Sequence, residues 1–320
     1  MLAISGWQVI TTSAKQRRLA RVSDMLCTVW RERNKYILAH VDVYSGLAFL
    51  WAELVCESLK QIGRPYVLTL HSGRLPAFAE HWPGRVQRLL RSASTVTTPS
   101  AFLCERMRQY RPDLVLLPNP IDLGAYHFLA RTNPKPRLIW LRAFHKIYNP
   151  SLAPRVIARL VEEFPDIHLT MVGPDKGDGS LRETERAATE LGVAQHISFH
   201  GAIHKGDVPL QLNQNDIFIN TTNVDNMPVS VIEAMACGLC VVSTNVGGIP
   251  NLIMDNREGL LVSPKDADGM ARAIRRILND ERLAKQLSHY AREKAGQFDW
   301  AGILPQWENL LAKAATDVQK

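Results

Sequence analysis

Short apolar runs alternate along this chain with longer stretches in which apolar residues recur every three or four positions. Such runs are typical of buried strands, and the periodic stretches are typical of helices that cover a sheet. Candidate strands occupy residues 8–11, 36–39, 66–70, 95–98 and 114–117 in the first half, and 138–141, 168–172, 197–200, 216–219, 239–243 and 260–262 in the second. This alternation predicts an α/β protein with parallel sheets flanked by helices.

A proline-rich connection, residues 118–136, separates the two groups of strands. Turn-rich segments of this kind are common between domains, and 320 residues with 46% apolar content can fill two cores. We predict a first domain over residues 1–130, a second over 136–297 and a final segment over 298–320. The final segment is expected to be helical from 298 to 315, with one apolar side formed by Trp300, Ile303, Trp307, Leu310 and Leu311.

Positive charge is concentrated in the first half of the chain. Up to Lys135 there are 18 Lys and Arg against 9 Asp and Glu, and the remainder carries 20 against 22, which together give the net charge of +7. Part of this excess lies on a predicted amphipathic helix whose apolar side is formed by Leu19, Val22, Met25, Leu26, Val29 and Trp30. Its basic side is either a solvated face or a surface for an anionic membrane. A nucleic-acid partner would rest on charge alone, and none is expected.

The chain shows no targeting pattern. Its longest apolar stretch, residues 46–56, contains Glu53 and is too short to span a bilayer, and the N-terminus lacks a charged start followed by an apolar core. Of the five cysteines, Cys237 and Cys240 form a single C-x-x-C, which fits small buried residues in a tight turn better than redox or metal chemistry. We expect a cytoplasmic protein, with peripheral attachment to the inner face of the membrane as a further expectation.

The most informative segment runs from Asp216 to Pro250, DIFINTTNVDNMPVSVIEAMACGLCVVSTNVGGIP. In it a buried strand leads into a polar loop, and the loop ends where a helix is predicted over 229–236. The first backbone N–H groups of a helix are unpaired and its dipole is positive there, so a diphosphate or sugar hydroxyls can bind. Asp225 lies in the loop, and Glu233 lies about one and a half turns into the helix.

These residues resemble the retaining glycosyltransferases of family four, which share the two-domain GT-B fold. The family signature is an acidic residue, seven others, then Glu-Ala-Met-Ala-x-Gly and a later Gly-Gly-Ile-Pro turn, which here are Asp225, residues 233–238 and residues 247–250. The resemblance implies two Rossmann-like domains whose parallel sheets face each other across a cleft, with a last helix that crosses back onto the first domain.

The resemblance also implies roles for residues of this segment. Glu233 would bind the ribose hydroxyls of the donor nucleotide, and Asp225, where the family usually has Glu, would contact the transferred sugar. Asn226, Met227, Pro228 and Val229 would complete this part of the donor site. The alternative is structural: Asp225 and Pro228 only start the helix, and Glu233 is solvated.

Cations are expected near the diphosphate, because negative charge grows on the leaving group as the glycosidic bond breaks. Arg142 follows the strand 138–141, where family members carry an arginine with a lysine five residues later. In this chain Lys146 comes four residues later and Ile147 five. Arg142 and Lys146 are therefore the candidate phosphate ligands, the alternative being exposed loop charges.

Two further positions follow from the resemblance. His71, at the end of the strand 66–70, would face the donor sugar, although a structural histidine is the alternative there. The backbone near Gly201 would pair with the nucleotide base. His71, Arg142 and Asp225 are the candidate catalytic residues, and no metal ion or other cofactor is expected besides the donor substrate.

The start of the chain departs from the family, which begins with a strand, a glycine-rich loop and a helix. Residues 1–7 lead directly into 8–11, which is similar to the family's second strand, so the first domain is expected to lack its opening strand. The resemblance implies retaining transfer of a hexose from a nucleotide-diphosphate sugar to a glycan or lipid-linked acceptor. The alternatives are a non-catalytic sugar-nucleotide-binding protein and a GT-B sugar-nucleotide epimerase.

Overall fold

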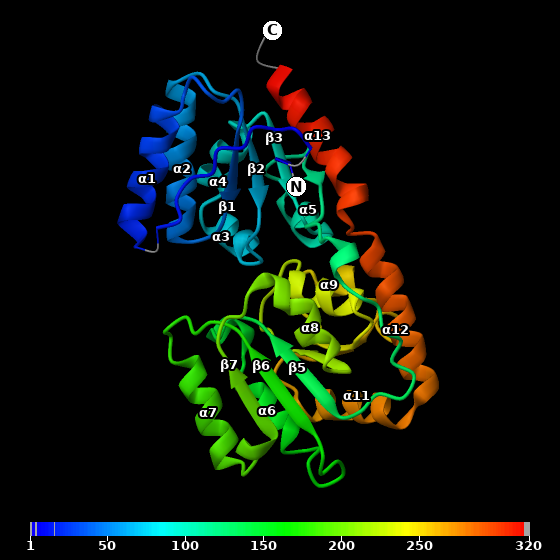
Figure 1. Ribbon diagram of the computed structural model, residues 1–320. Coiled ribbons are helices and arrows are strands. Elements are labelled where there is room, and N and C mark those ends of the chain that lie inside the picture. The colour runs from blue at the N-terminus through cyan, green and yellow to red at the C-terminus, as the bar shows by residue number, and fades with distance from the viewer. Residues whose placement is uncertain (1, 4, 16, 317–320) are drawn as a thin grey trace. The chain divides into compact units, whose positions relative to one another are not determined.

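The computed structural model describes residues 2–3, 5–15 and 17–316. These divide into two compact units (Figure 1). Unit 1 holds the described residues up to Asn119 together with those from Trp300 onward, and unit 2 is Pro120–Asp299. The chain therefore enters and leaves unit 2 once each.

Unit 1 is built on a parallel sheet with the strand order β1-β2-β3-β4. The strands are β1 (Ala39–Val43), β2 (Tyr66–Leu70), β3 (Thr95–Thr98) and β4 (Val115–Leu116). β1 lies at one edge of this sheet and pairs with β2 over its whole length, from Ala39 opposite Tyr66 to Val43 opposite Leu70. β2 is buried at every position, so its alternating side chains contribute to packing on both faces.

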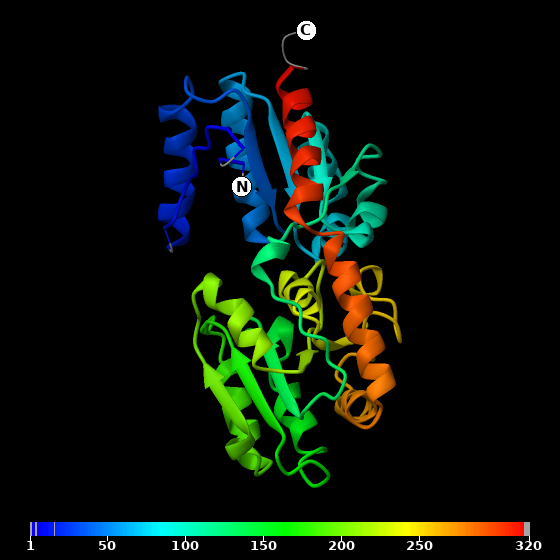
Figure 2. The same cartoon turned by 45° about the vertical axis from the view of Figure 1, so that its right-hand side comes forward.

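Helices cover both faces of the unit 1 sheet. Leu68 and Leu70 of β2 pack on one face in a core shared with helices α2 to α5, whereas Val67 packs on the other with Leu311 and Ala314 of α13 (Figure 2). The helices of unit 1 are α1 (Arg18–Arg31), α2 (Leu47–Gln61), α3 (Leu75–His81), α4 (Pro83–Arg91), α5 (Ala101–Met107) and α13 (Trp300–Thr316). α1 packs on α2, and its Met25, Leu26 and Val29 belong to the same core, which confirms the predicted helix. Leu19 and Trp30, also predicted on its apolar side, are instead 85% and 43% exposed.

The first two predicted strands are wrong. Residues 8–11 form no strand, and Val9 and Ile10 are 50% and 42% exposed. A short apolar run makes a strand only where a neighbouring strand supplies hydrogen-bond partners. The second strand starts at Ala39 instead of residue 36. The preceding residues belong to the connection after α1, where the Tyr36 hydroxyl donates to the carbonyl of Val29 at 3.0 Å.

Unit 2 contains a six-stranded parallel sheet in the order β10-β9-β8-β5-β6-β7. The strands are β5 (Arg137–Leu141), β6 (His168–Val172), β7 (Ile197–His200), β8 (Ile217–Asn220), β9 (Cys240–Thr244) and β10 (Leu260–Val262). The chain starts at β5, steps outward through β6 and β7, then returns to the other side of β5 and continues outward. This is the doubly wound order of a Rossmann-like sheet.

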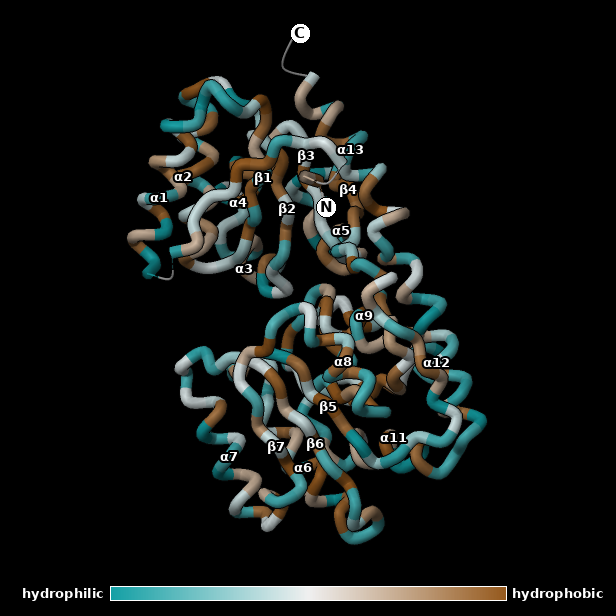
Figure 3. Tube along the Cα trace, viewed as in Figure 1, coloured by the Kyte–Doolittle hydropathy of each residue, from teal (hydrophilic) through white to brown (hydrophobic). Residues whose placement is uncertain are grey.

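Each face of the unit 2 sheet carries its own apolar core. Trp140 and Met171 pack with α6, α11 and part of α12 on one face, and Ile139 and Phe218 pack with α8, α9 and α10 on the other. The apolar stretches of β5 and β6 are visible in Figure 3. The helices are α6 (Leu152–Ile157), α7 (Ser180–Glu190), α8 (Val208–Asn213), α9 (Val229–Ala236), α10 (Ile249–Leu252), α11 (Ala267–Asn279) and α12 (Glu281–Gly296), with 3-10 turns η1 (Leu123–Ala125), η2 (Lys146–Tyr148), η3 (Ala194–His196) and η4 (Lys205–Asp207).

The α/β class with parallel sheets is confirmed in both units. In unit 2 every predicted strand forms, and β6, β7, β10 and α9 have the predicted bounds. Within the described part of the chain, no helix combines the length and the apolar character needed to cross a membrane.

Candidate functional site

The strand order of unit 2 reverses between β5 and β8, and the predicted donor residues gather at the carboxyl ends of these two strands. Arg142 directly follows β5, and Asp225 lies in the loop that joins β8 to α9. Glu233 lies on α9 itself. In doubly wound sheets, ligands bind outside the carboxyl ends of the strands at this reversal. Unit 2 therefore brings together three residues that the sequence predicts for one site.

Arg142 is held firmly at this position. Its Nη2 forms an ion pair with Oδ2 of Asp225, and the two side chains are only 12% and 10% exposed. Its Cζ lies 4.0 Å from the centroid of the Tyr148 ring. Its Nε is buried and has no hydrogen-bond partner among the described residues. Because buried polar groups are normally paired, the oxygen of a bound anion would complete this guanidinium.

Both carboxylate oxygens of Asp225 have a partner. Oδ2 pairs with Arg142, and Oδ1 accepts from the backbone N–H of Asn226 at 2.9 Å. Burial raises the pKa of Asp225, and Arg142 and the Asn226 N–H act in the opposite direction. The N-cap position of α9 is Pro228 and not Asp225. The alternative in which Asp225 and Pro228 only start the helix is therefore wrong for Asp225, while Pro228 does occupy the helix start.

The Gly-Gly-Ile-Pro turn fixes the loop that carries Asp225. Gly247 has a φ of 55°, and a Cβ built there would lie 2.0 Å from the carbonyl oxygen of Asp225. A Cβ at Gly248 would lie 1.9 Å from the carbonyl oxygen of Asn226. The Gly248 N–H also donates to the Asp225 carbonyl at 3.2 Å. Only glycine lets two backbones approach this closely, which explains why the turn accompanies the acidic signature.

Glu233 is buried, with 7% exposed, so the alternative of a solvated Glu233 is also wrong. The hydroxyl of Tyr126 donates to its Oε1 at 2.7 Å. Burial raises the pKa of Glu233, while the Tyr126 hydroxyl and the charge of Lys205 lower it. Burial and the neighbouring Glu233 raise the pKa of Tyr126, which therefore keeps its proton and donates. A buried carboxylate of this kind can accept hydrogen bonds from hydroxyl groups of a ligand.

The start of α9 adds backbone donors to the site. The helix begins at Val229, directly after Pro228, which lacks a side-chain acceptor for the first N–H groups. The Ser230 hydroxyl is buried and has no hydrogen-bond partner within the described part of the chain. Asn226 and Met227, just before the helix, are buried. The positive end of the helix dipole thus lies beside Asp225, where an anion is favoured.

Lys146 opens η2 in the segment that follows β5, and Gly201 directly follows β7. The Lys146 side chain is exposed, and its backbone N–H donates to Oδ2 of Asp178 at 2.9 Å. Although burial acts to raise it, hydrogen bonds from Lys146 and Ser180 lower the pKa of Asp178 to about 2. Gly201 is exposed, and its carbonyl accepts from the Gly173 N–H at 3.2 Å.

His71 belongs to unit 1, where it directly follows β2. Its Nε2 lies 2.9 Å from Oδ1 of Asp42 on β1, and its ring stacks with that of Tyr44 at 5.5 Å between centroids. Burial acts to raise the pKa of Asp42, but the hydrogen bond with His71 and the charges of His71 and His40 leave it below its ordinary value. The carboxyl end of the unit 1 sheet thus carries a histidine–carboxylate pair.

The cysteines of the C-x-x-C are both free and buried. Burial raises the pKa of Cys237 to about 11 and that of Cys240 to about 12, so both remain protonated near neutral pH, and thiols in that form are poor nucleophiles. Across the described ranges, no group of three or more His, Cys, Asp or Glu side chains is placed to hold a metal ion.

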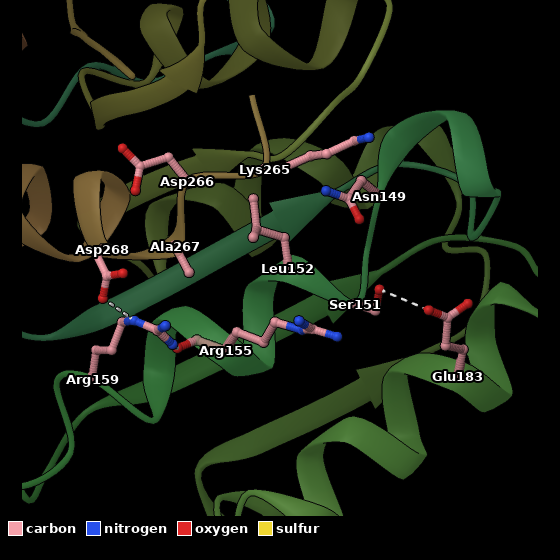
Figure 4. A pocket seen from close by; sticks show the side chains of 10 residues that line it. All are labelled: Asn149, Ser151, Leu152, Arg155, Arg159, Glu183, Lys265, Asp266, Ala267 and Asp268. Carbon is pink, nitrogen blue, oxygen red and sulfur yellow. Dashed lines mark hydrogen bonds and ion pairs between the residues drawn. The ribbon is translucent and has the colours of Figure 1, made fainter. Parts of the chain in front are cut away.

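Unit 2 also has a surface pocket of about 310 Å³, lined by Asn149, Arg155, Glu183 and other residues (Figure 4). Its carboxylates are already engaged: Glu183 accepts from the Ser151 hydroxyl at 3.3 Å, Asp266 accepts from the N–H of Gly269 at 2.7 Å, and Asp268 pairs with Arg159. The predicted site residues do not line it. We therefore assign the candidate site to the reversal point of the sheet.

Sequence reasoning missed Tyr126, Tyr148 and Asp178. Tyr126 has no motif around it and is 107 residues from Glu233. Asp178 is followed two residues later by Ser180, which opens α7, and this helix-start pattern was an available signal. Tyr148 lies in the segment where the spacing between Arg142 and the next lysine departs from the family, and that departure was also a signal.

The fold and the site together define a doubly wound α/β protein with an anion-binding edge at its reversal point. The chain belongs to the family described as glycosyl transferases group 1, which matches residues 128–294. This confirms the resemblance at the level of group 1, and the finer placement in family four stays a prediction.

Relatives with known names are similar over part of this chain. It is 30% identical over 162 residues to a D-inositol 3-phosphate glycosyltransferase of Mycobacterium ulcerans, which covers 49% of this chain and 35% of the relative. It is 29% identical over 168 residues to a GDP-mannose-dependent alpha-(1-6)-phosphatidylinositol monomannoside mannosyltransferase of Mycolicibacterium smegmatis, covering 50% and 42%. The matched segments thus span less than half of either relative.

Solved structures resemble the fold over nearly the whole chain. The sucrose-phosphate synthase of Thermosynechococcus elongatus has a TM-score of 0.80 at 21% identity, covering 96% of this chain and 81% of its own. HepE of Anabaena in complex with UDP has a TM-score of 0.76 at 19% identity, covering 92% and 82%. These similarities confirm the GT-B fold class, while the predicted cleft between the units stays a prediction.

Proposed function

We propose that this protein transfers a hexose from a nucleotide-diphosphate sugar to a glycan or lipid-linked acceptor, with retention at the anomeric carbon. The observation that carries the proposal is the buried Arg142–Asp225 pair beside the start of α9, with the carboxylate of Glu233 on the same helix. Membership of the glycosyl transferases group 1 supports it. So do the names of the relatives, which include a GDP-mannose-dependent mannosyltransferase, and a HepE structure in complex with UDP-glucose.

In this proposal the donor lies along the carboxyl edge of the unit 2 sheet. Glu233 accepts hydrogen bonds from the ribose hydroxyls, and the backbone near Gly201 pairs with the base. The unpaired Nε of Arg142 and the N–H groups at the start of α9 bind the diphosphate. Lys146, with its exposed ammonium group, is a further candidate for a phosphate oxygen.

The proposed chemistry exchanges one bond at the anomeric carbon. The bond to the diphosphate oxygen breaks, the bond to the acceptor oxygen forms on the same face, and the acceptor's proton moves to the departing diphosphate. Arg142 and the α9 dipole stabilise the negative charge that grows on the leaving group, so we propose that no metal ion is required. Asp225 orients the transferred sugar.

Calorimetry with uridine, guanosine and adenosine diphosphate sugars tests donor binding. We expect one base class to bind, and Glu233→Ala to weaken its binding by about tenfold or more, about 1.4 kcal/mol. Glu258→Ala is the matched control, because Glu258 is also a buried carboxylate of unit 2 but caps the N–H of Met254 away from the reversal point. A folded protein that binds none of these sugars would rule out the proposed function.

Donor binding alone does not separate a transferase from a non-catalytic binding protein. The discriminating measurement is release of nucleoside diphosphate with a panel of acceptors, run with and without a metal chelator. Transfer that survives chelation supports the proposal. Binding without turnover against every acceptor favours the non-catalytic alternative, and conversion of the donor to its C2 epimer favours the epimerase.

We further propose that unit 1 docks on an anionic membrane surface. Arg17 and Arg18 are exposed at the start of α1, and Leu19 beside them is 85% exposed. Flotation with vesicles containing anionic lipid should show binding that the double change Arg17→Gln, Arg18→Gln reduces by severalfold. The double change Arg88→Gln, Arg91→Gln on α4 removes the same charge from exposed positions elsewhere in unit 1 and serves as the control. An equal loss of vesicle binding in both variants would show that binding depends on net charge and not on the position of Arg17 and Arg18.

A further inference from the structure

The aromatic ring of Tyr148 lies against the guanidinium of Arg142. The 4.0 Å between the Arg142 Cζ and the ring centroid is a close stacking distance, at which a cation is attracted to the face of an aromatic ring. The guanidinium is thereby bounded on one face by the ring and at one nitrogen by the carboxylate of Asp225. These two contacts fix the orientation of the guanidinium group, and with it the direction of its unpaired Nε–H.

Both partners of this stack have fixed backbones. The Arg142 N–H donates to the carbonyl of Val172 at 3.0 Å, and its own carbonyl lies so close to Gly173 that a Cβ there would be 1.8 Å away. The Tyr148 N–H donates to the carbonyl of His145 at 2.8 Å, which closes η2. Its carbonyl accepts from the Thr221 hydroxyl at 2.7 Å. The stack therefore connects Arg142, at the end of β5, to Tyr148, whose backbone is hydrogen-bonded to Thr221 at the end of β8.

The loop after β5 differs from the pattern that the resemblance implied, in which a lysine follows the arginine by five residues. Ile147 occupies the position five residues after Arg142, and its carbonyl accepts from the N–H of Asn223 at 2.8 Å. The neighbouring Lys146 has an exposed side chain. Arg142 is thus the buried cation of this loop, and the orientation of its single guanidinium matters more than it would beside a second cation.

We propose that Tyr148 is a positioning residue that holds the guanidinium of Arg142 in the orientation that binds the donor diphosphate. This inference rests on the proposed function. A phenol hydroxyl is not needed for the stack, so phenylalanine should replace tyrosine, whereas an aliphatic side chain should not. We expect Tyr148 to contribute to the affinity for the phosphates and not to that for the nucleoside, because its ring acts only through Arg142.

The test compares Tyr148→Phe with Tyr148→Leu, using the nucleoside diphosphate of the base class that calorimetry identifies and the corresponding nucleoside in competition. We expect Tyr148→Phe to bind the diphosphate within about twofold of the wild type. Tyr148→Leu should bind it about tenfold more weakly, about 1.4 kcal/mol, and bind the nucleoside unchanged. Thermal unfolding checks that each variant is folded, and Tyr148→Met replaces Tyr148→Leu if the latter is not.

A double-mutant cycle with Arg142→Met separates positioning from general structure. If Tyr148 acts through Arg142, Tyr148→Leu should cause no further loss of diphosphate affinity in the Arg142→Met background. A loss that persists there, or one that affects nucleoside and diphosphate equally, would overturn the inference. Unchanged diphosphate affinity in Tyr148→Leu would overturn it while leaving the donor site intact. A wild type that binds no donor at all would overturn the proposed function as well.

Discussion

The two sheets of this protein carry polar groups at their carboxyl ends in different surroundings. In unit 2, Arg142 and Asp225 are about nine-tenths buried and bonded to each other. In unit 1, the side chain of Asp42 is 52% exposed on an edge strand, next to a partly buried His71. The pKa values follow this contrast: burial raises that of Asp225, whereas contact with His71 leaves that of Asp42 low despite partial burial.

This contrast in burial indicates where a substitution should have a small effect on stability and where it should have a large one. Removing one partner of a buried ion pair leaves a charge without solvation, whereas an exposed pair exchanges its partner for water. The surroundings of Asp225 also involve backbone: Gly247 and Gly248 contact its loop in a way that no larger residue allows. Changes in unit 2 should therefore have larger effects than changes in unit 1, and four variants test this order.

The largest effect is expected for Arg142→Met. The variant loses the cation that we propose binds the leaving diphosphate, and it leaves Asp225 buried without its ion-pair partner. Removal of a single stabilising group of this kind typically lowers turnover by about 10² to 10³, so we expect a loss of that order in release of nucleoside diphosphate. Arg142→Lys, which keeps the charge without the planar fork, should retain part of the activity. Wild-type turnover in Arg142→Met would remove Arg142 from the mechanism.

The next effect is expected for Gly248→Ala. The added Cβ would meet the carbonyl oxygen of Asn226 at 1.9 Å, so the loop must move, with a destabilisation of about 1–3 kcal/mol and weaker donor binding. Denaturant unfolding and calorimetry measure the two effects. Gly296→Ala at the end of α12 is the control, because its Cβ meets nothing within 4 Å. If both variants behave alike, the close approach is not what fixes the loop.

A smaller effect is expected for Glu233→Gln, in the pH dependence of stability. Because the folded-state pKa of Glu233 is raised by burial, its contribution to stability is fully present below its unfolded-state pKa and is lost as pH rises through the folded-state value. The substituted glutamine side chain cannot ionise, so the free energy of unfolding of the variant should gain on the wild type as pH rises from about 4 to about 8. A difference that stays constant over this range would show that the burial of Glu233 does not affect its ionisation.

The smallest effect is expected for Asp42→Asn in unit 1. The pair with His71 is partly exposed, so its loss should lower stability at neutral pH by at most about 1 kcal/mol. The pKa of Asp42 is lowered, so this contribution is present above the ordinary carboxyl pKa and should vanish as pH falls through the lowered value. Chemical unfolding at several pH values measures it. A loss as large as that of Gly248→Ala would contradict the contrast between the units.

The sequence predicted unit 2 more accurately than the start of unit 1. The strands β6 and β8 are mostly apolar and almost entirely buried, and segments of this kind carry a strong signal. Residues 8–11 show a similar short pattern, but no neighbouring strand pairs with them among the described residues. Strand formation there depends on a partner, which a local pattern does not reveal.

The candidate site was predictable where its residues follow one another. Asp225, Glu233 and the Gly247–Gly248 turn lie within one strand–helix–strand segment, whose spacing carries the geometry. The contact of Glu233 with Tyr126 joins residues far apart in the chain and leaves no local trace. The His71–Asp42 pair was hidden for another reason: the predicted strand 36–39 ended before Asp42, so the register that brings the pair together was not available.

The two ends of unit 2 meet within the unit itself. The N–H of Ile121 donates to the carbonyl of Phe298 at 2.8 Å, and Ile121 also forms a bridge with Asp299. Unit 2 is thus an insertion whose first and last residues are joined as soon as it folds. The closure entropy of a chain segment grows with its length, so an unfolded unit 2 would oppose the assembly of α13 with the rest of unit 1. Once folded, unit 2 removes most of that opposition, which favours a folding order in which the inserted unit forms first.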